Sequence, residues 1–212
     1  MHVVCIVVSV NYTDFLRRSL PLLVAACDVV VVVSQEGDSS VALCKEHDVA
    51  CYSYSGWQHN GAAFNKSGAL EQMQKMVHEK YPDSWVLIAD ADCEVPIELR
   101  QSINAMVTDK DVLYGIRRVD FQTPEEYAAA HARYYAFPFS GYFQLYFKKT
   151  AFYPVWSRNA SMCDCFFREH FNKWELLPGT VYHLGTDNVN WNGRKSQEWI
   201  ANEGRRKNRS FV

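Results

Sequence analysis

The sequence predicts an α/β fold with a mixed, mostly parallel sheet flanked by helices. The first observation is that short apolar runs rich in β-branched residues recur along the first half of the chain, as expected for strands buried on both faces. The second is that segments with helical spacing separate these runs. The third is that 212 residues, 48% of them hydrophobic, suit one domain with a large core.

The first half of the chain begins with three strands and two helices. Residues 3–10 and 29–33 are nearly continuous runs of valine and isoleucine, and residues 50–54 form a weaker third strand. The polar pair at 13–14 can cap the helix that follows the first strand, and a short helix is expected at 39–47.

The clearest helix of the sequence covers residues 65–80, where apolar side chains recur at helical spacing. It leads into a fourth apolar strand at 85–89. Because a helix separates each strand from the next, we expect these strands to pair in parallel through right-handed crossovers.

The second half of the chain has a different composition. Eight of the fourteen residues from 134 to 147 are aromatic, which predicts a segment of strand and loop. The other expected elements are a strand at 112–118, a helix at 125–133, a helix at 166–171, an extended segment at 180–184 and a helix at 196–202. Residues 204–212 are basic and polar, as in a tail or linker.

The overall charge and the cysteines limit the partners and the compartment. A formal net charge of -2 gives no reason to expect nucleic acid or an anionic membrane as a partner. The longest apolar stretch is too short to span a bilayer, and the first residues lack the basic leader of a signal peptide. Seven scattered cysteines indicate free thiols in a reducing compartment, so we expect a cytoplasmic protein.

Polar residues follow three of the predicted strands. Asn11 and Tyr12 follow the first strand, the loop at 34–38 follows the second, and Asp90 and Asp92 follow the fourth. Ligands of open α/β sheets bind at the carboxyl ends of the strands, so these segments should meet at one edge. In an extended segment the i, i+2 spacing puts both carboxylates on one side, where Mg²⁺ or Mn²⁺ relieves their repulsion.

Several α/β chemistries lack their motifs here. The sequence has no Gly-x-x-x-x-Gly-Lys phosphate loop, no Gly-x-Gly-x-x-Gly after the first strand and no Gly-x-Ser-x-Gly elbow. The Asp-x-Asp pair follows the fourth strand, whereas phosphatases of the haloacid dehalogenase type carry theirs after the first. A nucleotide-sugar transferase remains.

With these features the chain resembles the GT-A glycosyltransferases, in particular the small family-2-like domains of large DNA viruses and bacteria. The resemblance rests on residues 3–38, 65–96, 141–171 and 182–194. Its motifs are Asp90-Ala91-Asp92, His183-Leu184-Gly185 and Trp191-x-Gly193-Arg194. It implies a Rossmann-like GT-A domain over 1–203, with a nucleotide-binding half at 1–110 and an acceptor half at 111–203, and further domains after Val212 are compatible with it.

The metal and the donor are assigned by the same resemblance. Asp92 is expected to bind the metal directly, Asp90 to touch the ribose or the metal through water, and His183 to be the third ligand, which favours Mn²⁺ over Mg²⁺. The nucleotide-sugar is expected to contact Ser9, Val10, Asn11, Tyr12, Gln35, Asp38, Asn65, Lys66, Asp90, Ala91 and the diphosphate clamp Arg194. Two alternatives stay open: Asp38 caps its turn, and Lys66 pairs with Asp90.

Inversion at the anomeric carbon needs a general base, for which Asp164 is the first choice and Glu169 and Asp187 are the fallbacks. Asp164 could instead cap its helix. For the acceptor we expect contacts with Tyr142, Tyr146 and Trp156, because aromatic faces stack on sugars.

The sequence therefore predicts a metal-dependent enzyme that moves a hexose or deoxyhexose from a UDP-sugar to a glycan acceptor with inversion. The alternatives are a nucleotidyltransferase that makes a sugar nucleotide, and a non-catalytic domain that binds nucleotide-sugar or glycan within a larger protein.

Overall fold

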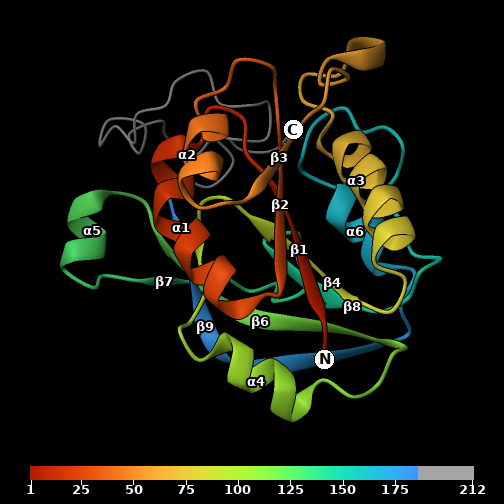
Figure 1. Ribbon diagram of the computed structural model, residues 1–212. Coiled ribbons are helices and arrows are strands. Elements are labelled where there is room, and N and C mark those ends of the chain that lie inside the picture. Colours follow the sequence, from red (N-terminus) through yellow and green to blue (C-terminus); the bar gives the residue numbers. More distant parts are fainter. Residues whose placement is uncertain (186–212) are drawn as a thin grey trace, which may run out of the picture.

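The strands form one mixed sheet in the computed structural model, which describes residues 1–185 (Figure 1). Within that range the strands are β1 (Val3–Val8), β2 (Val29–Ser34), β3 (Ala50–Ser53), β4 (Trp85–Asp90), β5 (Cys93–Glu94), β6 (Val112–Phe121), β7 (Arg133–Tyr134), β8 (Phe143–Tyr146) and β9 (Lys173–Leu184). They are arranged in the order β3-β2-β1-β4-β8-β6-β9-β5, and β7 pairs with the outer end of β6.

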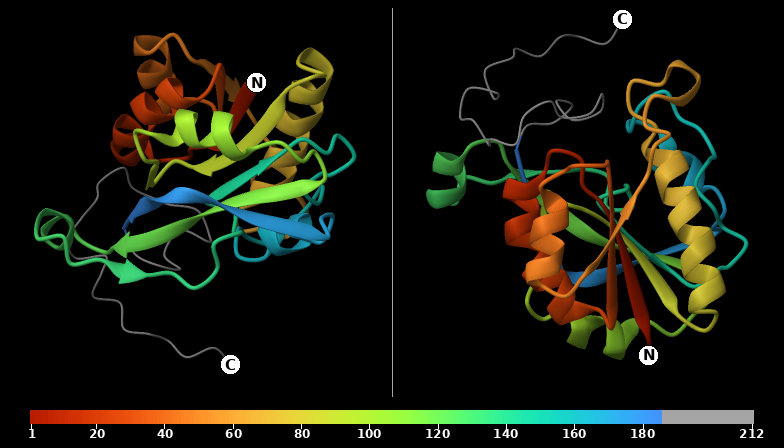
Figure 2. Two further views of the ribbon diagram at one scale, coloured as in Figure 1. Left: turned by 90° about the horizontal axis from the view of Figure 1, so that it is seen from below. Right: turned by 45° about the horizontal axis from the view of Figure 1, so that its top comes forward.

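The helices of the described residues are α1 (Thr13–Ala26), α2 (Ser40–Glu46), the 3₁₀ turn η1 (His59–Gly61), α3 (Lys66–Lys80), α4 (Leu99–Met106), α5 (Pro124–Ala128) and α6 (Cys163–Arg168). Helices α1, α2 and α4 cover one face of the sheet, and α3 and α6 cover the other (Figures 1 and 2). The predicted α/β fold is confirmed.

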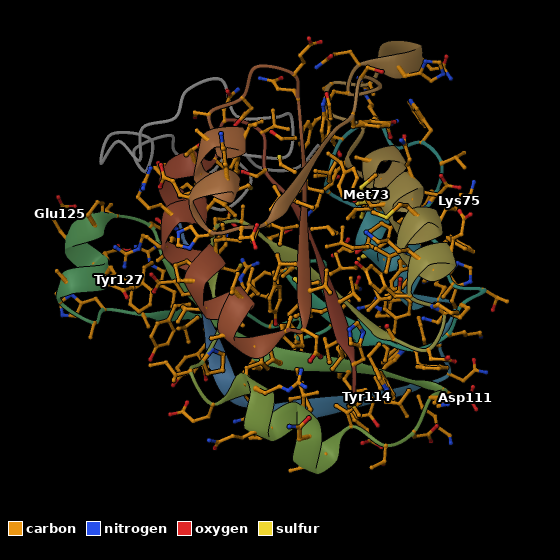
Figure 3. The ribbon with its side chains drawn as sticks, viewed as in Figure 1. Met73, Lys75, Asp111, Tyr114, Glu125 and Tyr127 are labelled. Atoms are coloured by element: carbon orange, nitrogen blue, oxygen red, sulfur yellow. The ribbon has the colours of Figure 1, made fainter. Side chains whose placement is uncertain are left out.

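Alternating side chains of the central strands supply both cores. On β1, Val3, Cys5 and Val7 face α1, while Val4 and Ile6 face α3, and all five are fully buried. Helix α3 likewise has a buried and an exposed face: Met73 packs toward the sheet, and Lys75 points away from it (Figure 3). A continuous apolar strand is what this two-sided burial requires.

The strand directions bring the carboxyl ends of the parallel strands to one edge of the sheet. β1 is parallel to β2 and β4, as predicted. β8 is antiparallel to both β4 and β6, so β6 runs in the same direction as β4, and β9 is parallel to β6. The ends of β1, β4, β6 and β9 therefore meet at one edge of the sheet.

The second half differs most from the prediction. The helix expected at 125–133 ends at Ala128, because Ala130 adopts a left-handed conformation with φ of 53°. The extended segment expected at 180–184 begins at Lys173, because Pro178 and Gly179 are accommodated by a bulge rather than ending the strand. The predicted helix at 166–171 covers Cys163–Arg168 instead.

Three elements, η1, α4 and β5, were not predicted. The helix expected at 196–202 and the tail at 204–212 lie outside the described residues. None of the helices within residues 1–185 has the length and apolar character needed to cross a bilayer.

Candidate active site

A cavity of about 440 Å³ opens at the edge where the four strand ends meet. Asp90, Ala91 and Asp92 lie in its wall after β4, and Val10 and Tyr12 line it after β1. Lys66 enters from the start of α3, and Asp164 from α6 in the second half of the chain. Segments far apart in sequence thus share one hollow, as expected for an open α/β sheet.

Asp90 is paired with Lys66, whose ammonium group contacts Asp90 Oδ1. Burial raises the pKa of Asp90, Lys66 opposes that effect and Asp92 adds to it, so the net direction is upward. Burial alone would lower the pKa of Lys66, but Asp90 outweighs it and the pKa is raised. The alternative in which Lys66 pairs with Asp90 is therefore realised, and Lys66 still lines the cavity.

His183 lies between two buried carboxylates. Its Nε2 is 3.4 Å from Asp92 Oδ2, and its Nδ1 is 3.0 Å from Asp120 Oδ1. Burial would lower the pKa of His183, but Asp92 and Asp120 outweigh burial and the nearby Arg118, and the pKa rises to about 9. Burial would raise the pKa of Asp92, yet His183 and Arg118 hold it below the usual value. Asp92 and His183 therefore each favour the charged form of the other.

Arg118 and Asp120, near the end of β6, are site residues that sequence analysis missed. Arg118 Nε donates a 2.7 Å hydrogen bond to Asp120 Oδ1, and its guanidinium lies 3.7 Å from the centre of the Tyr135 ring. Arg118 and Tyr135 both line the cavity. The available signal was the i, i+2 spacing of two charged residues at a strand end, the same pattern that drew attention to Asp90 and Asp92.

Asp164 lies in the part of the cavity wall that the second half of the chain provides, and it is held by backbone amides. The Gly141 N–H donates a 2.8 Å hydrogen bond to Oδ2, and the Cys165 N–H donates a 2.9 Å bond to Oδ1. A Cβ on residue 141 would lie 3.0 Å from the Cβ of Asp164, so glycine permits this close approach. Asp164 lies inside the first turn of α6, whose N-cap residue is Met162, so it does not fill the capping position, and its carboxylate lines the cavity.

The turn after β1 is organised internally by Asp38. Asp38 accepts hydrogen bonds from the Asn11 N–H at 2.7 Å and the Ser40 N–H at 2.8 Å, which is the capping alternative. The Ser9 hydroxyl bonds to Ser40 at 2.8 Å, and neither Ser9, Asn11 nor Asp38 lines the cavity. Gln35, on the same loop, is also outside the cavity wall. Ser9, Asn11 and Asp38 therefore organise the turn that carries Val10 and Tyr12.

Asn65 likewise has a structural position. It caps α3 by accepting a 3.2 Å hydrogen bond from the Gly68 N–H, and its Oδ1 also accepts from the Ser157 N–H at 2.9 Å. Asn65 is buried and does not line the cavity, so the predicted direct contact with the nucleotide-sugar does not fit its placement. It instead sets the start of the helix that presents Lys66.

The three aromatic residues expected at the acceptor lie in different places. Tyr142 lines the cavity with little exposed surface, and its hydroxyl donates to the Ile116 carbonyl. Tyr146 is fully buried under α3 and does not fit an acceptor role. Side chains alternate along β8, so Tyr146 faces the α3 side of the sheet, whereas Phe143 faces the other side. Trp156 is 40% exposed but lies outside the cavity wall.

The described residues offer two donors for a divalent cation. Within residues 1–185 no three His, Cys, Asp or Glu side chains converge as a complete metal site. Asp92 Oδ2 and His183 Nε2 are 3.4 Å apart, close to the separation of about 3.0 Å for two ligands at right angles in an octahedral shell. One oxygen and one nitrogen donor are ligand types that Mn²⁺ accepts. Arg194 and Asp187 lie outside the described residues.

The sequence matches the protein-family model described as Glycosyl transferase family 2 over residues 4–168, most of the chain. This range includes the Asp-x-Asp segment and Asp164. A search of curated proteins found no match.

Solved structures resemble the fold at low sequence identity. S. aureus TarS 1-349 matches with a TM-score of 0.62 and 13% identity over 87% of this chain, which spans 60% of that chain. Glucosyl-3-phosphoglycerate synthase from Mycobacterium tuberculosis, in complex with Mn²⁺, UDP and phosphoglyceric acid, matches at 0.52 with 11% identity, over 86% of this chain and 70% of that one. A 4-diphosphocytidyl-2C-methyl-D-erythritol synthase from Anaerococcus prevotii matches at 0.51 with 13% identity, over 95% and 94%.

Proposed function

The chain belongs to glycosyl transferase family 2, and we propose that it transfers a hexose or deoxyhexose from a UDP-sugar to a glycan acceptor with inversion at the anomeric carbon. The observation that carries the proposal is that Asp164 and the Asp90–Asp92 edge line the same cavity from opposite halves of the chain. A donor diphosphate at one wall then faces a base at the other.

The donor side is assigned to the residues at the ends of β1 and β4. Val10, Tyr12 and Ala91 line the wall where the nucleotide would lie, and Lys66 supplies a positive charge at the start of α3. Asp92 and His183 would hold Mn²⁺ or Mg²⁺. When bound, the cation supplies Lewis-acid neutralisation of the leaving diphosphate.

The acceptor side is assigned to Asp164. Its carboxylate takes the proton of an acceptor hydroxyl as that oxygen attacks the anomeric carbon opposite the diphosphate. One carbon–oxygen bond forms to the acceptor, the bond to the diphosphate breaks, and UDP leaves. The amides of Gly141 and Cys165 hold the carboxylate in one orientation, which keeps the base positioned for attack. Tyr142 and Phe137 contribute apolar surface beside it.

The test is turnover with a panel of UDP-sugars in the presence of Mn²⁺, with UDP release as the readout and product anomers identified by NMR. We expect slow UDP release without acceptor, faster release with a glycan acceptor, and an inverted product. Release of pyrophosphate from a nucleoside triphosphate and a sugar 1-phosphate would instead support the nucleotidyltransferase alternative, whose fold relatives resemble this chain. UDP binding without turnover on any donor would support the binding-domain alternative.

We also propose that the enzyme acts in the cytoplasm. The observation behind this proposal is that all seven cysteines are unpaired, and several of them are buried in the core.

A further inference from the structure

One buried carboxylate at the site has no part in the reaction proposed above. Asp120 is 4% exposed and lies near the end of β6, directly opposite His183 of β9 in the parallel ladder. The two strands run side by side in Figure 2. A buried carboxylate is costly to desolvate unless its partners compensate it, so its placement calls for a reason.

Asp120 Oδ1 lies beside two nitrogen-bearing side chains. It accepts from Arg118 Nε at 2.7 Å and lies 3.0 Å from His183 Nδ1. Nδ1 is a buried nitrogen with no aligned hydrogen bond within the described residues, so its contact with Asp120 is an ion pair. Arg118 is itself fixed over the Tyr135 ring at 3.7 Å, so Asp120 is anchored on one side and faces the imidazole on the other. The other edge of that imidazole, Nε2, faces Asp92.

We propose that Asp120 is the positioning residue of His183: it holds the Nδ1 edge of the ring so that Nε2 is presented beside Asp92, and it thereby sets the affinity of the site for a divalent cation and UDP. The inference rests on the proposed function for the role of His183 and adds a residue to it. A histidine that binds a metal through one nitrogen is commonly oriented by a hydrogen bond at the other, and loss of that partner weakens metal affinity by about 10- to 100-fold.

Arg118 alone does not account for the position of Asp120. The oxygen that accepts from Arg118 Nε, Oδ1, is also the one that faces His183 Nδ1, so the same atom serves both side chains. The parallel pairing of Asp120 with His183 fixes that juxtaposition in the backbone.

The test is a double-mutant cycle measured by calorimetric titration of UDP in the presence of Mn²⁺. Asp120→Asn in the otherwise native chain should weaken UDP binding at a fixed Mn²⁺ concentration by about tenfold. In a His183→Ala background the same substitution should change it by less than about twofold, because Asp120 then has no imidazole to hold. An unchanged affinity in Asp120→Asn, or an equal loss in both backgrounds, would overturn the proposal.

A matched control is available on the same two strands. Asp109 precedes β6 and pairs with Lys173 at the start of β9 at 3.1 Å, on the exposed surface. Asp109→Asn removes a carboxylate that joins the same strands but lies outside the cavity, and should leave the affinity for UDP unchanged.

A second measurement needs neither a variant nor a nucleotide. In wild-type protein with ¹⁵N-labelled histidine, His183 should give an Nδ1–H proton signal that exchanges slowly with solvent and shows a nuclear Overhauser contact to the Asp120 β protons. Absence of that contact would overturn the inference even if Asp120→Asn does not fold. If wild-type protein binds no UDP with Mn²⁺, the proposed function fails, and the Nδ1–H signal still decides whether Asp120 holds His183.

Discussion

Replacement of Asp164 by asparagine separates proton abstraction from donor binding. The asparagine side chain would keep one oxygen to accept from the Gly141 N–H, but its amide nitrogen would face the Cys165 N–H and lose the second bond. Loss of one such hydrogen bond costs about 1 kcal/mol, which lowers the melting temperature by about 2–4 °C for a protein of this size. The fold and the donor wall should therefore survive the change.

The effect of Asp164→Asn on catalysis should be much larger. Removal of a general base lowers kcat by about 10²- to 10⁴-fold, equivalent to about 3–5 kcal/mol in the activation barrier. The assay is UDP release under saturating donor and acceptor, with UDP affinity measured separately by calorimetry. We expect kcat to fall by at least about 100-fold while UDP affinity stays within about twofold of wild type, because Asp164 lies on the acceptor side of the cavity.

The matched control for Asp164 is Glu169, the exposed carboxylate that follows α6. Glu169 lies outside the cavity wall, so Glu169→Gln should leave kcat unchanged. If Asp164→Asn keeps kcat within about threefold of wild type, or if Glu169→Gln causes the larger loss, the assignment of the base is wrong.

Three further predictions concern groups around the two cores. Lys66→Met should cost about 2 kcal/mol of stability because it leaves a partly buried carboxylate without its partner, and it should abolish donor binding because it removes a positive charge from the cavity wall. Lys75→Met on the outer face of the same helix should cost less than about 0.5 kcal/mol. Urea unfolding measures the stability of both variants. Burial, and after it Lys149, lowers the pKa of His78 from an ordinary 6.5 to about 4, so as the pH falls the unfolded chain takes up the proton first. Between pH 6.5 and 4 the free energy of unfolding should therefore fall by about 1–2 kcal/mol more in the wild-type protein than in His78→Gln, a figure reduced for solvent screening of this half-buried ring. Equal pH curves for the two proteins would contradict this. Tyr146→Phe removes the 2.7 Å bond from Gln74 and should lower the free energy of unfolding by about 1 kcal/mol with kcat and KM unchanged, whereas a raised acceptor KM would restore Tyr146 to the acceptor site.

The first half of the fold could be predicted because its signals are local. Strands such as β1 and β4 are buried on both faces and therefore read as unbroken apolar runs, and α3 has clear helical spacing. The same locality placed Asp90 and Asp92 at a strand end, where the structure also has them. The long strand β9 was missed in part because Pro178 and Gly179 signal a break in sequence, while pairing with β6 absorbs them in a bulge.

The missed parts of the site depend on pairing between distant segments. Asp120 gains its role only because β6 lies beside β9, which brings it to His183. The spacing of Arg118 and Asp120 is visible in the sequence, but only the pairing of β6 with β9 shows that Asp120 meets His183. Asn65 and Asp38 show the converse: their residue types are favoured at caps and turns, and capping is what they do here.

The most direct measurement of the central claim is calorimetric titration of UDP into wild-type protein and into Asp92→Asn, each with and without Mn²⁺. Mn²⁺ should strengthen UDP binding to the wild-type protein, and this gain should be lost in Asp92→Asn, since Asp92 is the proposed carboxylate ligand. The result that would contradict it is a wild-type protein that binds no UDP, or an Asp92→Asn variant that retains the full Mn²⁺-dependent gain.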